Sequence, residues 1–160
     1  AQTSIRLFAD DAILYRPILS VSDCHTLQEQ LSRVANWAER WQLKFNVGKC
    51  TATSMRPTNF KFTYSFGSIP LRSLDHFVYL GVCIYDSLSF TEHISNTIRK
   101  SNCTLFMLMR ALKNASTLAK RTAYFSVCLP LTEYASEIWN PDLKYLIKDL
   151  EKINRKPHVK

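Results

Sequence analysis

The first pattern in the chain is a pair of short apolar runs on either side of a polar turn. Residues 5–8 and 12–15 are β-prone, and Ala9, Asp10 and Asp11 lie between them. Such runs around a tight turn predict a β-hairpin with two adjacent carboxylates at its tip. Aspartates are common in ordinary surface turns, but the apolar flanks favour a buried, rigid hairpin that presents both carboxylates together.

The second pattern is helical. Apolar residues recur every three or four positions from Leu27 to Trp41, which predicts a helix capped at its start by Ser22 or Asp23. We expect this helix to cover one face of the sheet that carries the hairpin. At this spacing, Trp37 and Trp41 are expected in the core.

Strict alternation returns over residues 60–66, where aromatic residues alternate with polar ones. This predicts a strand with one aromatic face, and a turn at residues 67–68 leads the chain back along residues 69–74. A further strand is expected at residues 51–56, ended by residues 57–59. Interleaved aromatic and basic residues can form a stacking platform for bases, but a packed sheet face is the simpler interpretation.

The C-terminal half is helical. A long helix opens at Thr91 and has a buried stripe that ends at Leu112, while Arg99, Arg110 and Lys113 fall on the opposite side. This arrangement predicts a helix with one apolar face and one basic face.

Two more helices are predicted after it. The third is expected to kink or restart at Pro130, which lacks a backbone N–H, and the fourth spans residues 142–156. The third helix carries a stripe at helical spacing, Leu118, Thr122, Phe125 and Leu129, together with basic Lys120 and Arg121. In the fourth helix, the expected inward residues are Leu143, Ile147 and Leu150.

Charge is distributed unevenly along the chain. The 160 residues carry a net charge of +8, and 46% of them are hydrophobic, which is typical of a globular protein. Residues 91–128 hold six Lys or Arg against one acid, and residues 144–160 hold six against two. Such clusters are typical of proteins with a polyanionic partner, although a helix face kept basic for solubility gives the same pattern.

Cysteine usage and apolar run lengths narrow the class of protein. The five cysteines never form a C-x-x-C pair, which argues against zinc sites and disulfide frameworks. His93 has no His or Cys at metal-ligand spacing and is interpreted as a capping or packing residue. No apolar run approaches ~20 residues and no leader is present. We therefore expect an intracellular protein of the cytoplasm and nucleus, without a membrane span.

Because the chain enters a strand directly after Ala1, we interpret it as a fragment.

Four blocks along the chain carry a resemblance to a known family. They are Phe8-Ala9-Asp10-Asp11, the Asn46-x-x-Lys49 element, Tyr79-Leu80-Gly81-Val82 and Trp139-Asn140-Pro141. In order and spacing they are similar to the reverse transcriptases of non-LTR (LINE-like) retrotransposons. Within the second block, Gly48 is expected to supply the backbone freedom of a tight turn.

The resemblance implies an α+β fold and a function. Residues 1–88 would be the C-terminal part of a polymerase palm, an antiparallel sheet with a packed helix that includes the catalytic hairpin and a primer-grip-like hairpin. Residues 89–160 would be a helical thumb. The implied reaction is RNA-directed DNA synthesis, in which a primer 3′-OH is extended with deoxynucleotides by two-metal phosphoryl transfer. The implied partners are an RNA template, a DNA primer, deoxynucleoside triphosphates and the missing fingers and palm of the same polyprotein.

The resemblance also implies roles for particular residues. Asp10 would be the main ligand of two Mg²⁺ or Mn²⁺ ions and Asp11 a supporting one, and Lys49 would face the phosphates of the incoming nucleotide. The remaining roles are Phe8 and Ala9 for the nucleotide, Tyr79, Leu80 and Gly81 for the primer, and Arg99, Arg110 and Lys113 for the duplex. Because the family uses a further aspartate on an earlier strand, we expect this fragment to be inactive alone.

Two alternatives from other classes remain open. In the first, the chain is a non-catalytic basic nucleic-acid-binding module from a decayed element. In the second, Asp10 and Asp11 form an ordinary turn on a structural helical scaffold. Metal-dependent binding of nucleotide would separate a polymerase from both.

Overall fold

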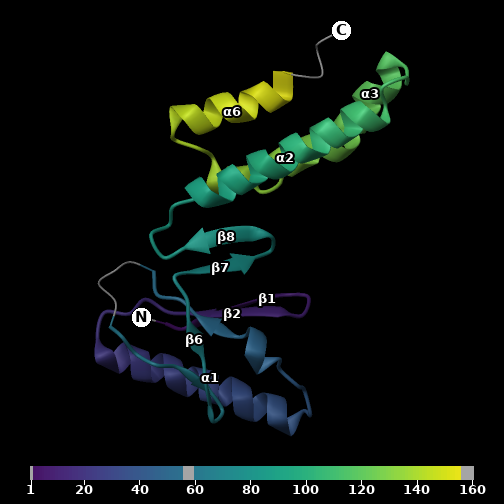
Figure 1. Cartoon of the computed structure of the whole chain (residues 1–160). Coiled ribbons are helices and arrows are strands. Elements are labelled where there is room, and N and C mark those ends of the chain that lie inside the picture. The colour runs from purple at the N-terminus through teal and green to yellow at the C-terminus, as the bar shows by residue number, and fades with distance from the viewer. Residues whose placement is uncertain (1, 56–59, 156–160) are drawn as a thin grey trace. The chain divides into compact units, whose positions relative to one another are not determined.

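A computed structural model describes residues 2–55 and 60–155 (Figure 1). The described chain divides into two compact units. Unit 1 contains the described residues up to Phe77 together with Tyr85–Leu88, and unit 2 contains Val78–Ile84 and the described residues from Ser89 onward. The mixture of helices and small sheets is compatible with the predicted α+β class, while palm and thumb remain predicted assignments.

Unit 1 contains one long helix and several short strands. Its elements are β1 (Ser4–Phe8), β2 (Asp11–Tyr15), α1 (Val21–Arg40), the 3₁₀ helix η1 (Val47–Lys49), β3 (Thr51–Ala52), β4 (Ser65–Phe66), β5 (Ile69–Pro70) and β6 (Arg72–Ser73). β1–β2 and β4–β5 are antiparallel hairpins, whereas β3 pairs with β6 in parallel. The strand predicted at 51–56 is therefore only two residues long in the described structure, and its predicted end at 57–59 lies outside the described residues.

The start of α1 is fixed by an acidic side chain. The Asp23 carboxylate accepts the backbone N–H groups of Leu19 at 3.2 Å and Ser20 at 3.1 Å. These bonds satisfy donors ahead of the first helical turn. The N-cap is Ser20, two residues before the earlier of the two predicted positions.

The apolar stripe of α1 is buried or half-buried as far as Ala38, but its two tryptophans are not in the core. Trp37 is 51% exposed and Trp41 is 65% exposed. Trp41 follows the last helical residue, and Trp37 lies next to the buried stripe rather than on it. The prediction that both are core residues is wrong.

The strand predicted over residues 60–66 is only two residues long, β4 (Ser65–Phe66), because residues 60–64 form no strand pairing. Their aromatic side chains nevertheless pack on α1, as the simpler interpretation predicted. The Phe62 ring meets the His25 ring edge-on at 5.1 Å between centroids. The Gln28 side chain makes two 2.9 Å hydrogen bonds with the backbone of Ser65. Phe62, Tyr64 and Phe66 are accordingly half-buried.

The β1–β2 hairpin has the predicted strands but not the predicted burial. Leu7 is 71% exposed and Phe8 is 58% exposed. Among the described residues this is a two-stranded sheet, and two strands alone provide few neighbours to cover their faces. The two aspartates therefore lie on an exposed hairpin, and the expectation of a buried one is wrong.

Unit 2 is a helical assembly joined to the tip of a hairpin. That hairpin consists of β7 (His76–Tyr79) and β8 (Val82–Tyr85), and its central part, Val78–Ile84, belongs to unit 2. The helices are α2 (Thr91–Ala111), α3 (Thr117–Ala123), the π-helical turn η2 (Tyr124–Cys128), α4 (Leu129–Glu133), α5 (Ser136–Trp139) and α6 (Lys144–Arg155). Figure 1 shows α6 running beside α2. Two buried clusters hold these helices together: Leu105, Tyr124, Cys128 and Ile153 in one, and Ile94, Trp139 and Leu146 in the other.

The predicted buried stripe of α2 is confirmed, but the stripe of the third helix is confirmed at one position alone. Leu129 packs against a buried cluster, whereas Leu118 is 74% exposed and Thr122 and Phe125 are exposed as well. Between Leu118 and Glu133 the buried residues are Tyr124, Cys128 and Thr132. This segment carries apolar residues on several faces, and the π-helical turn ahead of Pro130 breaks the regular period. Periodicity alone therefore does not identify the buried face of this segment.

The last helix shows the same ambiguity. α6 buries Leu146 and Ile153, while Leu143 and Ile147 are exposed. Of the three predicted inward residues, only Leu150 packs against a buried cluster. No helix in the described ranges is long and apolar enough to cross a membrane.

Candidate active site

Backbone pairing places two carboxylates at the end of the β1–β2 hairpin. Phe8, the last residue of β1, pairs with Asp11, so the loop consists of Ala9 and Asp10 alone. Ala9 has a φ of 50°, in the left-handed region that residues with a side chain rarely adopt. The turn thus holds Asp10 in the loop and Asp11 at the first position of β2.

Both carboxylates face solvent. Asp10 and Asp11 are exposed, and no hydrogen bond or ion pair reaches their side chains from the described residues. Carboxylate oxygens are ligands that Mg²⁺ and Mn²⁺ prefer. Residues 2–55 and 60–155 contain no group of three or more His, Cys, Asp or Glu that could hold a metal. The chemistry of the pair therefore suits one part of a divalent-metal site.

The open end of the same hairpin is fixed by an ion pair. The Arg16 guanidinium donates to Asp23 Oδ1 from Nε at 3.1 Å and from Nη2 at 2.6 Å, and to the Thr3 hydroxyl at 3.4 Å. This guanidinium, followed by hydrogen bonds from Ser20 and Leu19, lowers the pKa of Asp23 to about 2. The ion pair joins the end of the hairpin to the start of α1.

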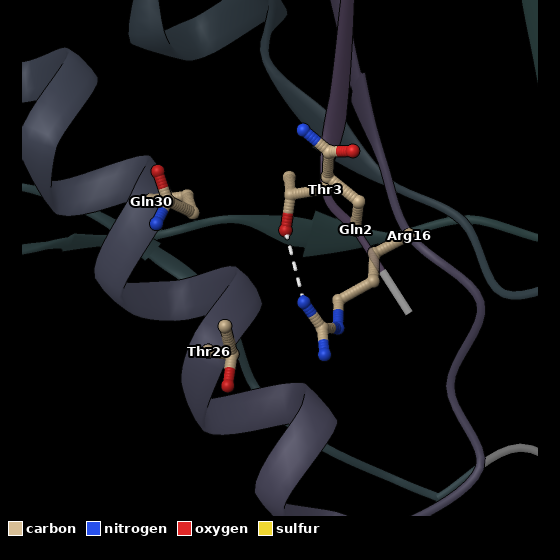
Figure 2. A pocket seen from close by; sticks show the side chains of 5 residues that line it. All are labelled: Gln2, Thr3, Arg16, Thr26 and Gln30. Carbon is tan, nitrogen blue, oxygen red and sulfur yellow. Dashed lines mark hydrogen bonds between the residues drawn. The ribbon is translucent and has the colours of Figure 1, made fainter.

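A hollow lies beside this ion pair (Figure 2). It is lined by Gln2, Thr3, Arg16, Thr26 and Gln30. The last paired residues at this end are Ser4 and Tyr15, four positions along each strand from the turn. At ~3.3 Å per residue, the hollow is roughly 13 Å from the carboxylates. It is therefore a separate feature from the carboxylate pair.

Lys49 lies in η1 with an exposed side chain. Its backbone N–H donates to the Asn46 carbonyl at 2.9 Å, and Arg72 Nη2 donates to the Gly48 carbonyl at 2.6 Å. No hydrogen bond or ion pair in the described structure links Lys49 to the hairpin carboxylates. Gly48 does not have a positive φ, and a Cβ there would meet Asn46 Oδ1 at an ordinary 3.4 Å. The expectation that this glycine supplies special backbone freedom is wrong.

The β7–β8 hairpin carries the predicted primer-contacting residues at its tip. After Tyr79, Leu80 and Gly81 have φ values of 47° and 80°, which match a two-residue type I′ loop. Tyr134 Oη donates to the Leu80 carbonyl at 2.6 Å, and a Cβ on Gly81 would lie 3.5 Å from the Tyr134 ring. This tip is thus supported by a residue 54 positions later in the sequence.

A second link joins the same hairpin to the helices. The Cys83 N–H donates to His93 Nδ1 at 3.3 Å, and the His93 ring meets Trp139 edge-on at 5.8 Å. Burial, with a further contribution from the Lys100 charge, lowers the pKa of His93, which favours the neutral ring that accepts this bond. Trp139 Nε1 in turn donates to the Tyr134 carbonyl at 2.8 Å. The interpretation of His93 as a packing residue is confirmed.

Tyr134 is not among the site residues predicted from the sequence. Its role depends on a contact with Leu80, and no periodicity or motif spacing reports a contact at that separation. The local backbone is irregular: the helix ends at Tyr134, whose ψ is 120°, and Ala135 then adopts the left-handed conformation, with φ 54° and ψ 23°. A sequence in which an alanine occupies that conformation gives no warning of it.

The outer face of α2 presents the predicted basic residues. Arg99 and Arg110 on the helix, and Lys113 just after it, are exposed. Arg99 donates to Asn96 Oδ1 at 3.3 Å, and no acidic side chain of the described residues forms an ion pair with any of the three. Their positive charge is therefore available to an anionic partner.

The comparisons with known proteins identify the class: the chain is similar to RNA-directed DNA polymerases of non-LTR retrotransposons. It is 29% identical over 141 residues to the probable RNA-directed DNA polymerase from transposon BS of Drosophila melanogaster. It is 26% identical over 147 residues to the RNA-directed DNA polymerase from mobile element jockey of the same species. No family model and no solved structure matches.

These alignments confirm the resemblance that the four sequence blocks predicted. They cover 82% and 84% of this chain, but only 15% of each relative. The chain thus spans a small part of the polymerases that it matches. The activity, the substrates and the individual site residues are therefore proposals for this chain.

Proposed function

We propose that this chain is a segment of an RNA-directed DNA polymerase that extends a primer 3′-OH with deoxynucleotides. The observation that carries the proposal is the exposed Asp10–Asp11 pair at a hairpin tip, in a chain similar over most of its length to such polymerases. The partners would be an RNA template, a DNA primer and deoxynucleoside triphosphates inside the cell.

In this proposal Asp10 and Asp11 contribute ligands for two Mg²⁺ or Mn²⁺ ions, with Asp10 as the main ligand. The ions would activate the primer 3′-OH and neutralise the charge of the leaving pyrophosphate. Cross-strand partners share one face of a hairpin, so the pairing of Phe8 with Asp11 puts both side chains on the same face. The exposed Phe8 ring, with Ala9 beside it, can then contact a nucleotide whose phosphates lie near the carboxylates.

The other proposed roles follow from charge and exposure. Lys49 would approach the triphosphate as an exposed ammonium and can donate a proton to the departing pyrophosphate. The tip at Tyr79, Leu80 and Gly81 would contact the primer strand, because Gly81 has no side chain to keep a sugar–phosphate backbone away. The basic face of α2 would bind phosphates of the template–primer duplex.

The test is a titration of Mn²⁺ into the nitrogen-15-labelled full chain, followed by amide line broadening. Because a bound paramagnetic ion broadens nearby nuclei, we expect the strongest effect at residues 8–13. Asp10→Asn should remove most of the broadening and Asp11→Asn less of it. Asp142→Asn, an exposed acid in unit 2, is the matched control and should leave it unchanged. Broadening that persists at the hairpin in Asp10→Asn would contradict the metal role.

A second function, nucleic-acid binding without catalysis, is favoured by the exposed basic face of α2. A non-catalytic module would bind nucleic acid but would show no focused Mn²⁺ broadening at the β1–β2 tip. The same titration therefore separates the two functions. Purified chain that supports template-directed synthesis by itself would contradict the expectation that this segment is inactive alone.

A further inference from the structure

Tyr134 is exposed to solvent and yet held at three points. Its side chain is 57% exposed. Its backbone N–H donates to the Pro130 carbonyl at 3.0 Å, its carbonyl accepts Trp139 Nε1 at 2.8 Å, and its hydroxyl donates to the Leu80 carbonyl at 2.6 Å. A residue with both backbone polar groups and its hydroxyl engaged has little conformational freedom.

The group that Tyr134 holds is one that the hairpin does not use itself. In a four-residue turn the hydrogen bond runs from the first carbonyl to the fourth N–H. The Leu80 carbonyl, at the second position, is therefore left for another donor. Leu80 also has a φ of 47°, a strained conformation for a bulky residue. The hydrogen bond from Tyr134 favours this conformation and fixes the direction of the Leu80 carbonyl.

A second strained residue follows Tyr134 directly. Ala135 is left-handed, with φ 54°, and its carbonyl accepts the Ile138 N–H at 2.9 Å. This bend ends α4 and leads into α5. Strained residues persist where the surrounding structure determines them, and they cluster at functional sites. Here one strained residue, Leu80, accepts the hydrogen bond, and the other, Ala135, directly follows its donor, Tyr134.

We propose that Tyr134 is a positioning residue for the primer strand, which it serves by holding the β7–β8 tip in the conformation that meets the primer's 3′ end. This inference rests on the proposed function of that tip. Tyr134 acts through the backbone of Leu80 and Gly81 and takes no part in the chemistry. A loop that is ordered before binding loses less conformational entropy when it binds than a flexible loop does. Its affinity for the primer strand is therefore higher than that of a flexible loop.

The test is Tyr134→Phe in the full chain, which removes the hydroxyl and keeps the ring. The loss of one neutral hydrogen bond should speed amide hydrogen exchange at residues 79–83 by about two- to tenfold. Binding of a template–primer duplex with a recessed 3′ end should weaken by up to the same factor. Binding of a blunt duplex of equal length should not change, and the salt dependence should keep its slope because no phosphate contact is lost.

Tyr145→Phe is the matched control, because Tyr145 is an equally exposed tyrosine on α6. It should leave both exchange and binding unchanged. Unchanged exchange in Tyr134→Phe would overturn the proposal, and so would faster exchange with an unchanged affinity for the recessed duplex. A wild-type chain that does not prefer the recessed end to the blunt one would instead overturn the proposed function of the tip, before any substitution is made.

Discussion

The β1–β2 and β7–β8 hairpins have loops of the same length, but only the β7–β8 tip is held by hydrogen bonds from side chains elsewhere in the described chain. Residues 9–10 form one loop and residues 80–81 the other, and each loop begins with a non-glycine residue at positive φ. Among the described side chains, none reaches the tip of β1–β2 with a hydrogen bond or ion pair. The tip of β7–β8 is bonded by Tyr134, and the strand after it is bonded by His93.

This difference matches what each tip is proposed to do. Two carboxylates that bind metal ions and a nucleotide must stay accessible, and their negative charge already provides attraction. A loop that contacts a strand through its backbone has no charge of its own, so its shape must be fixed in advance. The comparison predicts that substitutions near the first tip change binding with little effect on stability, while substitutions behind the second tip change both.

The largest expected effect is that of Trp139→Ala, which removes the side chain behind the supported tip. Trp139 is 1% exposed, and truncation of a buried tryptophan costs about 3–5 kcal/mol. We expect a loss of this size in the free energy of unfolding measured with urea. Trp41→Ala, at a tryptophan that is 65% exposed, is the control and should change it by at most ~0.5 kcal/mol. Equal losses in the two variants would contradict the comparison.

The next effect concerns nucleic-acid affinity and compares the two units. Arg99, Arg110 and Lys113 should each release counterions on binding a duplex, at about 0.9 in the log–log salt slope per contact. Replacing all three by Gln should lower the slope by roughly 2–3 units. The matched control replaces three exposed basic residues of unit 1, Arg33, Arg40 and Lys44, by Gln. An equal decrease in both triple variants would show that only net charge matters.

A smaller effect is expected at the unsupported tip. Ala9 has a φ of 50°, which costs an alanine about 1–2 kcal/mol. Glycine adopts this conformation freely but loses ~0.5–1 kcal/mol through its more flexible unfolded state. Ala9→Gly should therefore stabilise the hairpin by about 0.5 kcal/mol, measured by hydrogen exchange in β1 and β2. Ala12→Gly, inside β2, should destabilise it; stabilisation by both would refute the argument from φ.

The smallest expected effect is a pH dependence at the supported hairpin. Because burial lowers the pKa of His93 below its usual 6.5, the unfolded chain takes up the proton first as pH falls. The contribution of neutral His93 to stability is therefore complete above about pH 6.5 and is lost as pH falls through its lower folded value. Urea unfolding between pH 7.5 and 5 should show this loss. In His93→Gln, which keeps an acceptor for the Cys83 N–H, the curve should be flatter.

The sequence predicts those features that neighbouring residues determine. The hairpin around Asp10, the helix that follows it, the turn at Gly67 and the basic side of α2 all follow from patterns within a few positions. The exact loop length and the N-cap residue do not, because Asp11 pairs within β2 and Ser20 caps the helix. The four blocks, read in order, were also sufficient to predict the class of protein. Each of these features depends on local propensity or on short motifs.

What the sequence does not predict depends on distant contacts. The parallel pairing of β3 with β6 joins segments about twenty residues apart, and the Tyr134–Leu80 bond joins positions 54 apart. The exposure of Leu7 and Phe8 depends on which strands lie beside them. After residue 117, apolar residues occur on several faces, so the buried face is selected by packing against Leu105 and its neighbours.

The discontinuity of unit 2 has a consequence for synthesis of the chain. The β7–β8 tip leaves the ribosome before the helices that hold it, because Tyr134 is added 54 residues after Leu80. At ~5–20 residues per second, the interval is roughly three to ten seconds. During that time, the Leu80 carbonyl lacks the Tyr134 hydroxyl that donates to it in the finished structure. The loop proposed to contact the primer is therefore among the last parts of the chain to reach its final form.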